Sequence, residues 1–139
     1  MRRLNIYFMH SEKFDYNNLI YKDVLSSRVC LNHNIILPRT KTYESVYAKD
    51  LISKADLVVA FLNNPSFGLD IELRWLKKFN KKTLFLCLDE NVPKKYLKKY
   101  KDVKIVTTEH YFITLTEQFI KENENDDVAN DNVVLLGKL

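Results

Sequence analysis

Residues Ala55–Leu73, ADLVVAFLNNPSFGLDIEL, hold the pattern that decides the fold. Within them, Leu57–Leu62 is a continuous apolar run, which is typical of a strand covered on both faces of a sheet. A polar turn follows, and the helical spacing of the next apolar residues predicts a helix over Leu69–Phe79. A buried strand joined by a short turn to a helix is part of a βαβ unit, so this stretch indicates a layered α/β fold.

The same alternation runs through the rest of the chain. Short apolar runs predict strands over Leu4–Met9, Ile35–Leu37, Leu57–Leu62, Thr83–Leu88 and Val103–Val106. Helical spacing predicts helices over Tyr16–Leu31, Glu44–Lys54, Leu69–Phe79, Pro93–Tyr100 and Tyr111–Lys121. The first helix is predicted from the helical spacing of Leu19, Ile20, Val24 and Leu25. In the second, the residues expected to face inward are Val46, Leu51 and Ile52. The pattern predicts a three-layer, doubly wound α/β domain, flavodoxin-like or Rossmann-like, with a five-stranded and mostly parallel sheet.

Length and composition indicate one domain followed by a tail. The chain has 139 residues, of which 46% are hydrophobic, enough to fill one core. We assign the domain to residues 1–122 and expect the acidic start of the tail, residues 123–139, to be disordered. The apolar end of the tail, VVLLGKL, either docks on a partner surface or is a frayed end.

Composition also limits the classes of function. No apolar run is long enough for a membrane helix, and the N-terminus lacks the features of a signal peptide, so we expect a cytoplasmic protein. Cys30 and Cys87 have no metal-ligand spacing and are expected to be core residues rather than disulfide partners. The net charge is +4, with much of the excess in Lys94–Lys104. That segment is either a solvated surface helix, which we favour, or a nucleic-acid contact.

The turn between the central strand and its helix has the chemistry of an anion site. The first N–H groups of a helix lack internal partners and carry partial positive charge, and Ser66 adds a hydroxyl. Gly68 is one of only two glycines in the chain, and it would let a ligand approach the backbone. Glu72 falls on the helix face that should pack on the sheet, where an unpaired carboxylate is rare. The alternative is a first-turn acid that points to solvent.

The end of the first strand supplies further polar side chains. In a doubly wound sheet, ligands bind outside the carboxyl ends of the strands, where the strand order reverses. Tyr7, His10, Ser11 and Lys13 should therefore lie beside the turn described above. His10 is either a proton carrier that contacts substrate or a hydrogen-bonding bystander. We expect neither a metal nor a cofactor.

Three segments resemble the nucleoside 2-deoxyribosyltransferase superfamily. These are YFMHS at Tyr7–Ser11, the stretch Ala55–Leu73, and FNKKTLFLCL at Phe79–Leu88. The chain is most similar to the branch of 2-deoxynucleoside 5′-phosphate N-hydrolases, whose motifs run Tyr-Phe-x-Gly-Ser-x-Arg and Pro-Ser-x-Gly-x-x-x-Glu-Leu. The resemblance covers about residues 5–120 and implies an enzyme that cleaves the N-glycosidic bond of a deoxynucleoside 5′-monophosphate.

The resemblance also implies roles for single residues. Glu72 matches the glutamate that attacks the anomeric carbon of the sugar, and Tyr7 matches the tyrosine that orients it. Ser66, Ser11 and Lys13 match ligands of the 5′-phosphate, although lysine stands where the family has arginine and His10 stands where it has glycine.

The resemblance also implies a proton donor and an oligomeric state. Asp50 is the candidate for the family's general acid, although it lies about two residues closer to the third strand than is usual. Family members complete their sites with a residue from a second subunit, so a homodimer or larger homo-oligomer is implied. A catalytically inactive nucleotide-binding or sensor module on the same fold is the alternative function, and a nucleic-acid partner is the least favoured.

Overall fold

The chain folds around a single parallel sheet. The structure is a computed structural model that describes the backbone of residues 2–138 and the side chains as far as Glu124. The five strands lie in the order β2-β1-β3-β4-β5. Their bounds are β1 Asn5–Met9, β2 Asn34–Ile36, β3 Leu57–Phe61, β4 Thr83–Cys87 and β5 Lys104–Ile105. Every pair is parallel, and this strand order is the flavodoxin-like one, so the predicted fold class is confirmed.

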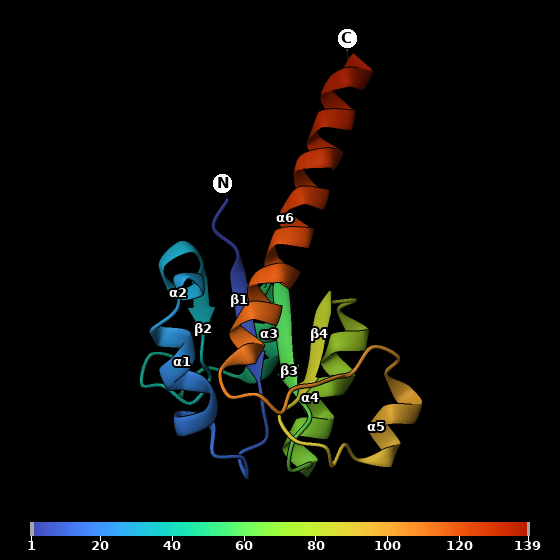
Figure 1. Ribbon diagram of the computed structural model, residues 1–139. Helices are drawn as coiled ribbons and strands as arrows, with labels where there is room; N and C mark the ends of the chain where they lie inside the picture. Colours follow the sequence, from blue (N-terminus) through green and yellow to red (C-terminus); the bar gives the residue numbers. More distant parts are fainter. Residues whose placement is uncertain (1, 139) are drawn as a thin grey trace.

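Helices cover both faces of the sheet (Figure 1). Their bounds are η1 Asn17–Tyr21 (a π-helix), α1 Lys22–Leu25, α2 Arg28–Asn32, α3 Ala48–Lys54, α4 Phe67–Lys78, α5 Lys94–Lys99 and α6 Tyr111–Lys138. One core cluster joins Ile6 and Phe8 of β1 to the first three helical segments and α6. A second joins Tyr7 and Met9 to α3, α4 and α5. Because side chains alternate along a strand, β1 serves both layers of the core.

The first predicted helix, over Tyr16–Leu31, is broken in the structure into η1, α1 and α2. At the break, Ser27 has an extended backbone, with φ −98° and ψ 165°. The hydroxyls of Ser26 and Ser27 donate to the carbonyl oxygens of Lys22 and Val24, so local hydrogen bonds replace continued helix. Of the apolar residues whose spacing predicted this helix, Ile20 and Val24 are buried, whereas Leu19 and Leu25 are exposed.

The second predicted helix, over Glu44–Lys54, begins four residues later than expected. Residues 41–46 form turns, and α3 starts at Ala48. Val46 is exposed instead of buried, whereas Leu51 and Ile52 lie in the core as predicted. The turn residues are held by backbone bonds from the amides of Tyr43 and Glu44 to the Thr40 carbonyl.

The last helix, α6, extends beyond the compact domain in Figure 1. Its first part packs on the sheet through the buried side chains of Phe112 and Ile120. The predicted disorder concerns the acidic start of the tail, and the side chains beyond Glu124 lie outside the described residues. The division of the chain into a domain over 1–122 and a tail therefore stays a prediction.

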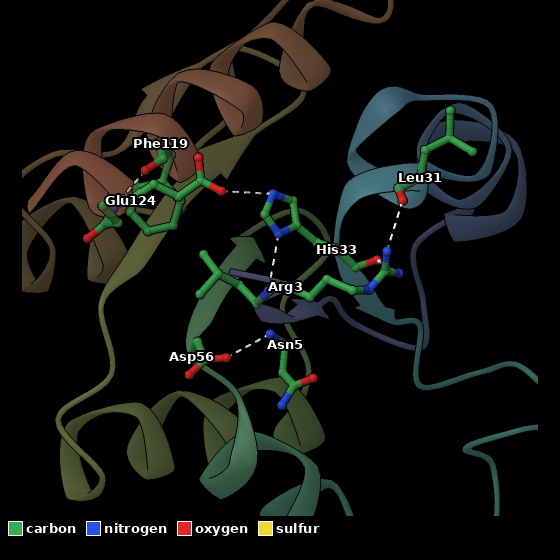
Figure 2. A network of polar contacts seen from close by, with 9 residues as sticks. Arg3, Asn5, Leu31, His33, Asp56, Phe119 and Glu124 are labelled. Atoms are coloured by element: carbon green, nitrogen blue, oxygen red, sulfur yellow. Dashed lines mark hydrogen bonds and ion pairs between the residues drawn. The ribbon is translucent and has the colours of Figure 1, made fainter. Parts of the chain in front are cut away.

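A polar network fastens α6 to the edge of the sheet opposite the predicted site (Figure 2). The Leu4 amide donates to Nδ1 of His33 at 3.1 Å, which places the ring proton on Nε2. That nitrogen lies 3.3 Å from Glu124 Oε1 on α6. Nearby, the Arg3 guanidinium donates to the carbonyl oxygens of Leu31 and His33. These contacts close the amino-terminal edge of the sheet around a buried histidine.

Two further expectations can be checked against the fold. Both cysteines are free, with Cys87 buried and Cys30 half-buried. Within the residues that the structure describes, no helix is long and apolar enough to cross a membrane.

Candidate active site

The candidate site lies at the carboxyl ends of β1 and β3, where the strand order reverses. The loops after these strands and the start of α4 meet at this edge, the lower one in Figure 1. A hollow of about 340 Å³ opens there. Its lining residues are Tyr7, His10, Tyr16, Pro38, Arg39, Glu44, Val46, Ala48, Leu51 and Glu72. It is therefore a polar cleft built from β1 and the segment that follows it, the loop after β2, α3 and α4.

Glu72 and Tyr7 form the centre of this cleft. Helix α4 packs on the sheet through Leu69, Leu73 and Leu76, and Glu72 shares that side of the helix. The Tyr7 hydroxyl donates to Glu72 Oε1 at 2.5 Å, so one carboxylate oxygen is fixed. Burial raises the pKa of Glu72 to about 7, although the Tyr7 hydrogen bond and the Arg39 charge pull that pKa downward. The structure thus holds a carboxylate inward, with ionisation near neutrality.

His10 takes part in a fixed network beside this pair. Its Nδ1 lies 3.0 Å from the Ser11 carbonyl oxygen and its Nε2 lies 2.7 Å from the Tyr21 hydroxyl. A carbonyl can only accept, so Nδ1 carries the proton and Tyr21 donates to Nε2. Burial lowers the pKa of His10 to about 4, and the ring is stacked on Tyr16 at 4.6 Å. His10 is therefore a neutral wall residue at physiological pH.

The turn at the start of α4 already holds a carboxylate of the chain itself. Ser66 is the N-cap of α4, and its Oγ accepts from the Leu69 amide at 3.1 Å. The same hydroxyl donates to Glu12 Oε2 at 2.9 Å. A methyl group added at Gly68 would meet that carboxylate oxygen at 3.4 Å, which is ordinary contact. Glu12 therefore occupies the place where the sequence predicted a bound anion.

The other predicted residues do not line the cleft. Ser11 is buried and its Oγ accepts from the Lys13 amide at 3.1 Å, while the Lys13 side chain is exposed. Neither residue lines the cleft, and neither do Ser66 and Gly68. Asp50 is exposed on α3 and also lies outside the lining, although its neighbours Ala48 and Leu51 belong to it.

Three charged residues of this region were not predicted from the sequence. Arg39 and Glu44 line the cleft, and Glu12 fills the turn. Arg39 comes directly after Pro38, which ends the second predicted strand. Its position at the carboxyl edge of the sheet could therefore have been predicted from the sequence. Glu44 was assigned to a helix that in fact begins later. Glu12 gave no signal because its partner, Ser66, lies 54 residues away.

A larger hollow lies among α4, β4 and the end of α5. Its volume is about 810 Å³. It is lined by Leu73, Arg74, Leu76, Lys77, Lys78, Asn80, Lys81, Thr83, Phe85, Lys99 and Tyr100. None of the predicted site residues belongs to it, so the smaller cleft is the better candidate for chemistry. Over the described residues, no cluster of His, Cys, Asp or Glu has the arrangement of a metal site.

Comparison with known proteins supports the fold. No family model matches the chain, and no curated protein matches its sequence. Among solved structures, the chain is similar to the CMP N-glycosidase BcmB of Clostridium botulinum. The two share a TM-score of 0.59 and 18% sequence identity, over 83% of this chain and 98% of the other. At this identity the likeness establishes the shared layered α/β fold.

Proposed function

We propose that this protein is an N-glycosidase that cleaves the bond between base and sugar in a nucleoside 5′-monophosphate. The observation that carries the proposal is the half-buried Glu72 carboxylate, held by the Tyr7 hydroxyl at 2.5 Å and lining a cleft of about 340 Å³. The neighbour BcmB, a CMP N-glycosidase by name, supports the reaction class, and the resemblance of the Pro65–Leu73 motif supports the nucleophile.

The proposed reaction has two displacements at C1′ of the sugar. First, the free oxygen of ionised Glu72 attacks C1′, and the C1′–N bond breaks with its electron pair leaving on the base. A proton is then delivered to the base nitrogen. Water attacks C1′ of the resulting glycosyl ester, and the C1′–O bond breaks to regenerate the carboxylate. The proton that the water loses goes to the group that protonated the base, which restores that group. The products are free base and sugar phosphate, and one water is consumed.

The structure favours Glu44 over Asp50 as the second carboxyl group in this scheme. Glu44 lines the cleft together with Glu72, whereas Asp50 does not. A second acidic group near the leaving base supplies the proton that an unactivated base needs. Glu44, directly or through a water, is therefore the proposed proton donor. A homodimer and a cytoplasmic location, both expected from the sequence, stay predictions.

The test is release of free base from purified protein. Wild type, Glu72→Ala and the control Asp70→Asn are incubated with the common ribo- and deoxyribonucleoside 5′-monophosphates, and free base is measured by chromatography. Asp70 is a suitable control because it lies on the same helix but pairs outward with Lys95 at 2.8 Å. We expect Glu72→Ala to lose on the order of 10³-fold or more in rate, while Asp70→Asn keeps its rate. Equal release from wild type and Glu72→Ala would refute the role of Glu72.

The alternative is a nucleotide-binding module without turnover. It is favoured by the carboxylate of Glu12 in the turn, which departs from an open phosphate cradle. Calorimetry with the same nucleotides distinguishes the two functions. Binding without base release over many hours would support the binding module and contradict the enzyme.

A further inference from the structure

Arg39 is an exposed cation that lines the cleft. It follows β2 and lines the same hollow as Tyr7 and Glu72. Its backbone N–H donates to the Tyr21 hydroxyl at 3.0 Å, so the chain at this point is anchored to η1. Within the described part of the chain, no carboxylate lies within ion-pair distance of its guanidinium.

The turn at the start of α4 carries a negative charge, the carboxylate of the exposed residue Glu12. Glu12 Oε2 lies 2.9 Å from Ser66 Oγ, at the start of α4. Its pKa is lowered by its own backbone amide and by Ser66, so the group is an anion at neutral pH. A phosphate brought to this turn would have to displace Glu12 and lose the hydrogen bond from Ser66. Like charges at such short distance repel, which makes the turn unfavourable for a second anion.

We propose that Arg39, and not the turn at Gly68, binds the phosphate of the substrate. This inference rests on the proposed function, and it moves the phosphate site away from the residues that the family resemblance names. A guanidinium presents paired N–H donors that match two phosphate oxygens, and it stays charged at every relevant pH. Arg39 thereby selects nucleoside 5′-monophosphates over nucleosides, while Glu12 directs the phosphate to it.

The inference is tested by the ratio of kcat/KM for a monophosphate to kcat/KM for the matching nucleoside. The substrate pairs are CMP with cytidine and the four common deoxynucleoside monophosphates with their nucleosides. We expect Arg39→Gln to lower the ratio by about 10- to 100-fold, because a charged bidentate contact to the phosphate is lost. Loss of the Arg39 charge also raises the pKa of Glu72, which slows both substrates alike at neutral pH and leaves the ratio unaffected. Arg39→Lys should restore part of the ratio, since lysine keeps the charge but not the fork.

Two further variants separate Arg39 from the turn. Lys41→Gln removes a neighbouring exposed cation and should leave both rates unchanged. Ser66→Ala should leave the ratio unchanged if the phosphate avoids the turn. A loss of the ratio in Ser66→Ala, with Arg39→Gln unaffected, would overturn the inference. An equal fall for monophosphate and nucleoside in Arg39→Gln would also overturn it.

The role of Arg39 can also be tested if the protein proves not to be an N-glycosidase. If wild type releases no base from any substrate, the ratio is replaced by calorimetric affinities of CMP and cytidine. The inference then stands if wild type binds CMP more tightly than cytidine and Arg39→Gln abolishes the difference. It falls if the two proteins show the same preference. In either case Tm values of the variants, measured by thermal denaturation, confirm that each is folded.

Discussion

The ionisation of one side chain, Glu72, determines when the proposed nucleophile is active. Its pKa of about 7 results from burial, offset by the hydrogen bond from Tyr7 and the charge of Arg39. A carboxyl group attacks carbon only when ionised, so kcat/KM should rise with pH through about 7. Measured pH–rate profiles that are flat between pH 5.5 and 8 would contradict this assignment.

Tyr7 is predicted to set the position of that rise. Tyr7→Phe removes the donor that stabilises the ionised form, so the pKa of Glu72 should move upward by about one unit, worth about 1.4 kcal/mol. At pH 6.5 the variant should lose about tenfold in rate for this reason, with a smaller loss at pH 8.5. The control Tyr47→Phe changes an exposed hydroxyl and should keep the wild-type profile. A uniform loss at every pH would show that Tyr7 acts by position alone.

Glu44 and Asp50 offer a direct comparison between a cleft residue and a surface residue. We expect Glu44→Gln to lower release of natural bases by about 10²- to 10⁴-fold, because proton delivery to the leaving base is lost. A substrate whose leaving group needs no proton, such as 4-nitrophenol, should be affected far less. Asp50→Asn should leave both rates near wild type, since Asp50 does not line the cleft. The reverse order of effects would restore Asp50 as the proton donor.

The neighbouring site residues that could be predicted from the sequence are those that lie on strands and helices. Tyr7 lies on a strand and Glu72 on a helix, and strand and helix periods fix where such side chains point. Arg39 and Glu44 lie in the segment after β2, whose turns follow no period. The side chain of Glu12 depends on a distant hydroxyl, so its position is a tertiary property. Sequence reasoning therefore found the pair at the centre and missed the charges around it.

At the scale of elements, strands were easier to predict than helices. The apolar runs of β1, β3 and β4 are bounded by polar residues, and the observed strands fall within one residue of the predicted ends. The helix over Tyr16–Leu31 failed because adjacent serines offered the backbone alternative hydrogen bonds. Upstream of the break, the short π-helix η1 carries Tyr21, whose hydroxyl lies 2.7 Å from His10 Nε2.

The start of α4 yields a prediction for stability. Ser66 Oγ accepts from the Leu69 amide, which caps one of the unpaired N–H groups of the first turn. Ser66→Ala should lower the free energy of unfolding by about 1 kcal/mol, up to about 2. Urea denaturation measures the change, with Ser66→Thr as the variant that keeps the cap and Ser45→Ala as an exposed control. An unchanged midpoint in Ser66→Ala would mean that the cap is dispensable.

At the scale of the whole molecule, the cleft holds two groups, Glu72 and His10, whose pKa values are shifted in opposite directions by folding. Glu72 titrates near pH 7 in the folded state and near 4.5 when unfolded. His10 titrates near pH 4 when folded and near 6.5 when unfolded. Between about pH 4.5 and 6.5 the folded state therefore holds one extra proton on Glu72 and lacks one on His10. The two effects on the pH dependence of stability cancel in this window.

Single substitutions should reveal the separate effects of His10 and Glu72 on the pH dependence of stability. In Glu72→Gln only His10 remains, and since the unfolded state then binds more protons, stability should rise from pH 4 to 6.5. In His10→Gln only Glu72 remains, and since the folded state binds more protons, stability should fall from pH 4.5 to 7. In each variant the free energy of unfolding should change by up to roughly 3 kcal/mol across its pH range, because one pKa unit is worth about 1.4 kcal/mol.

The measurement is urea denaturation at several pH values between 4.5 and 7.5, with slopes compared between variants so that other titrating groups cancel. Lys41→Gln is the control and should follow wild type at every pH, since its side chain lies outside the cleft. We expect the free energy of unfolding to change with pH in opposite directions in the two cleft variants, because one keeps only the group that gains a proton on folding and the other keeps only the group that loses one. Parallel curves for all four proteins would show that neither group has a displaced pKa. The half-buried carboxyl group on which the proposed chemistry depends would then ionise like an exposed one.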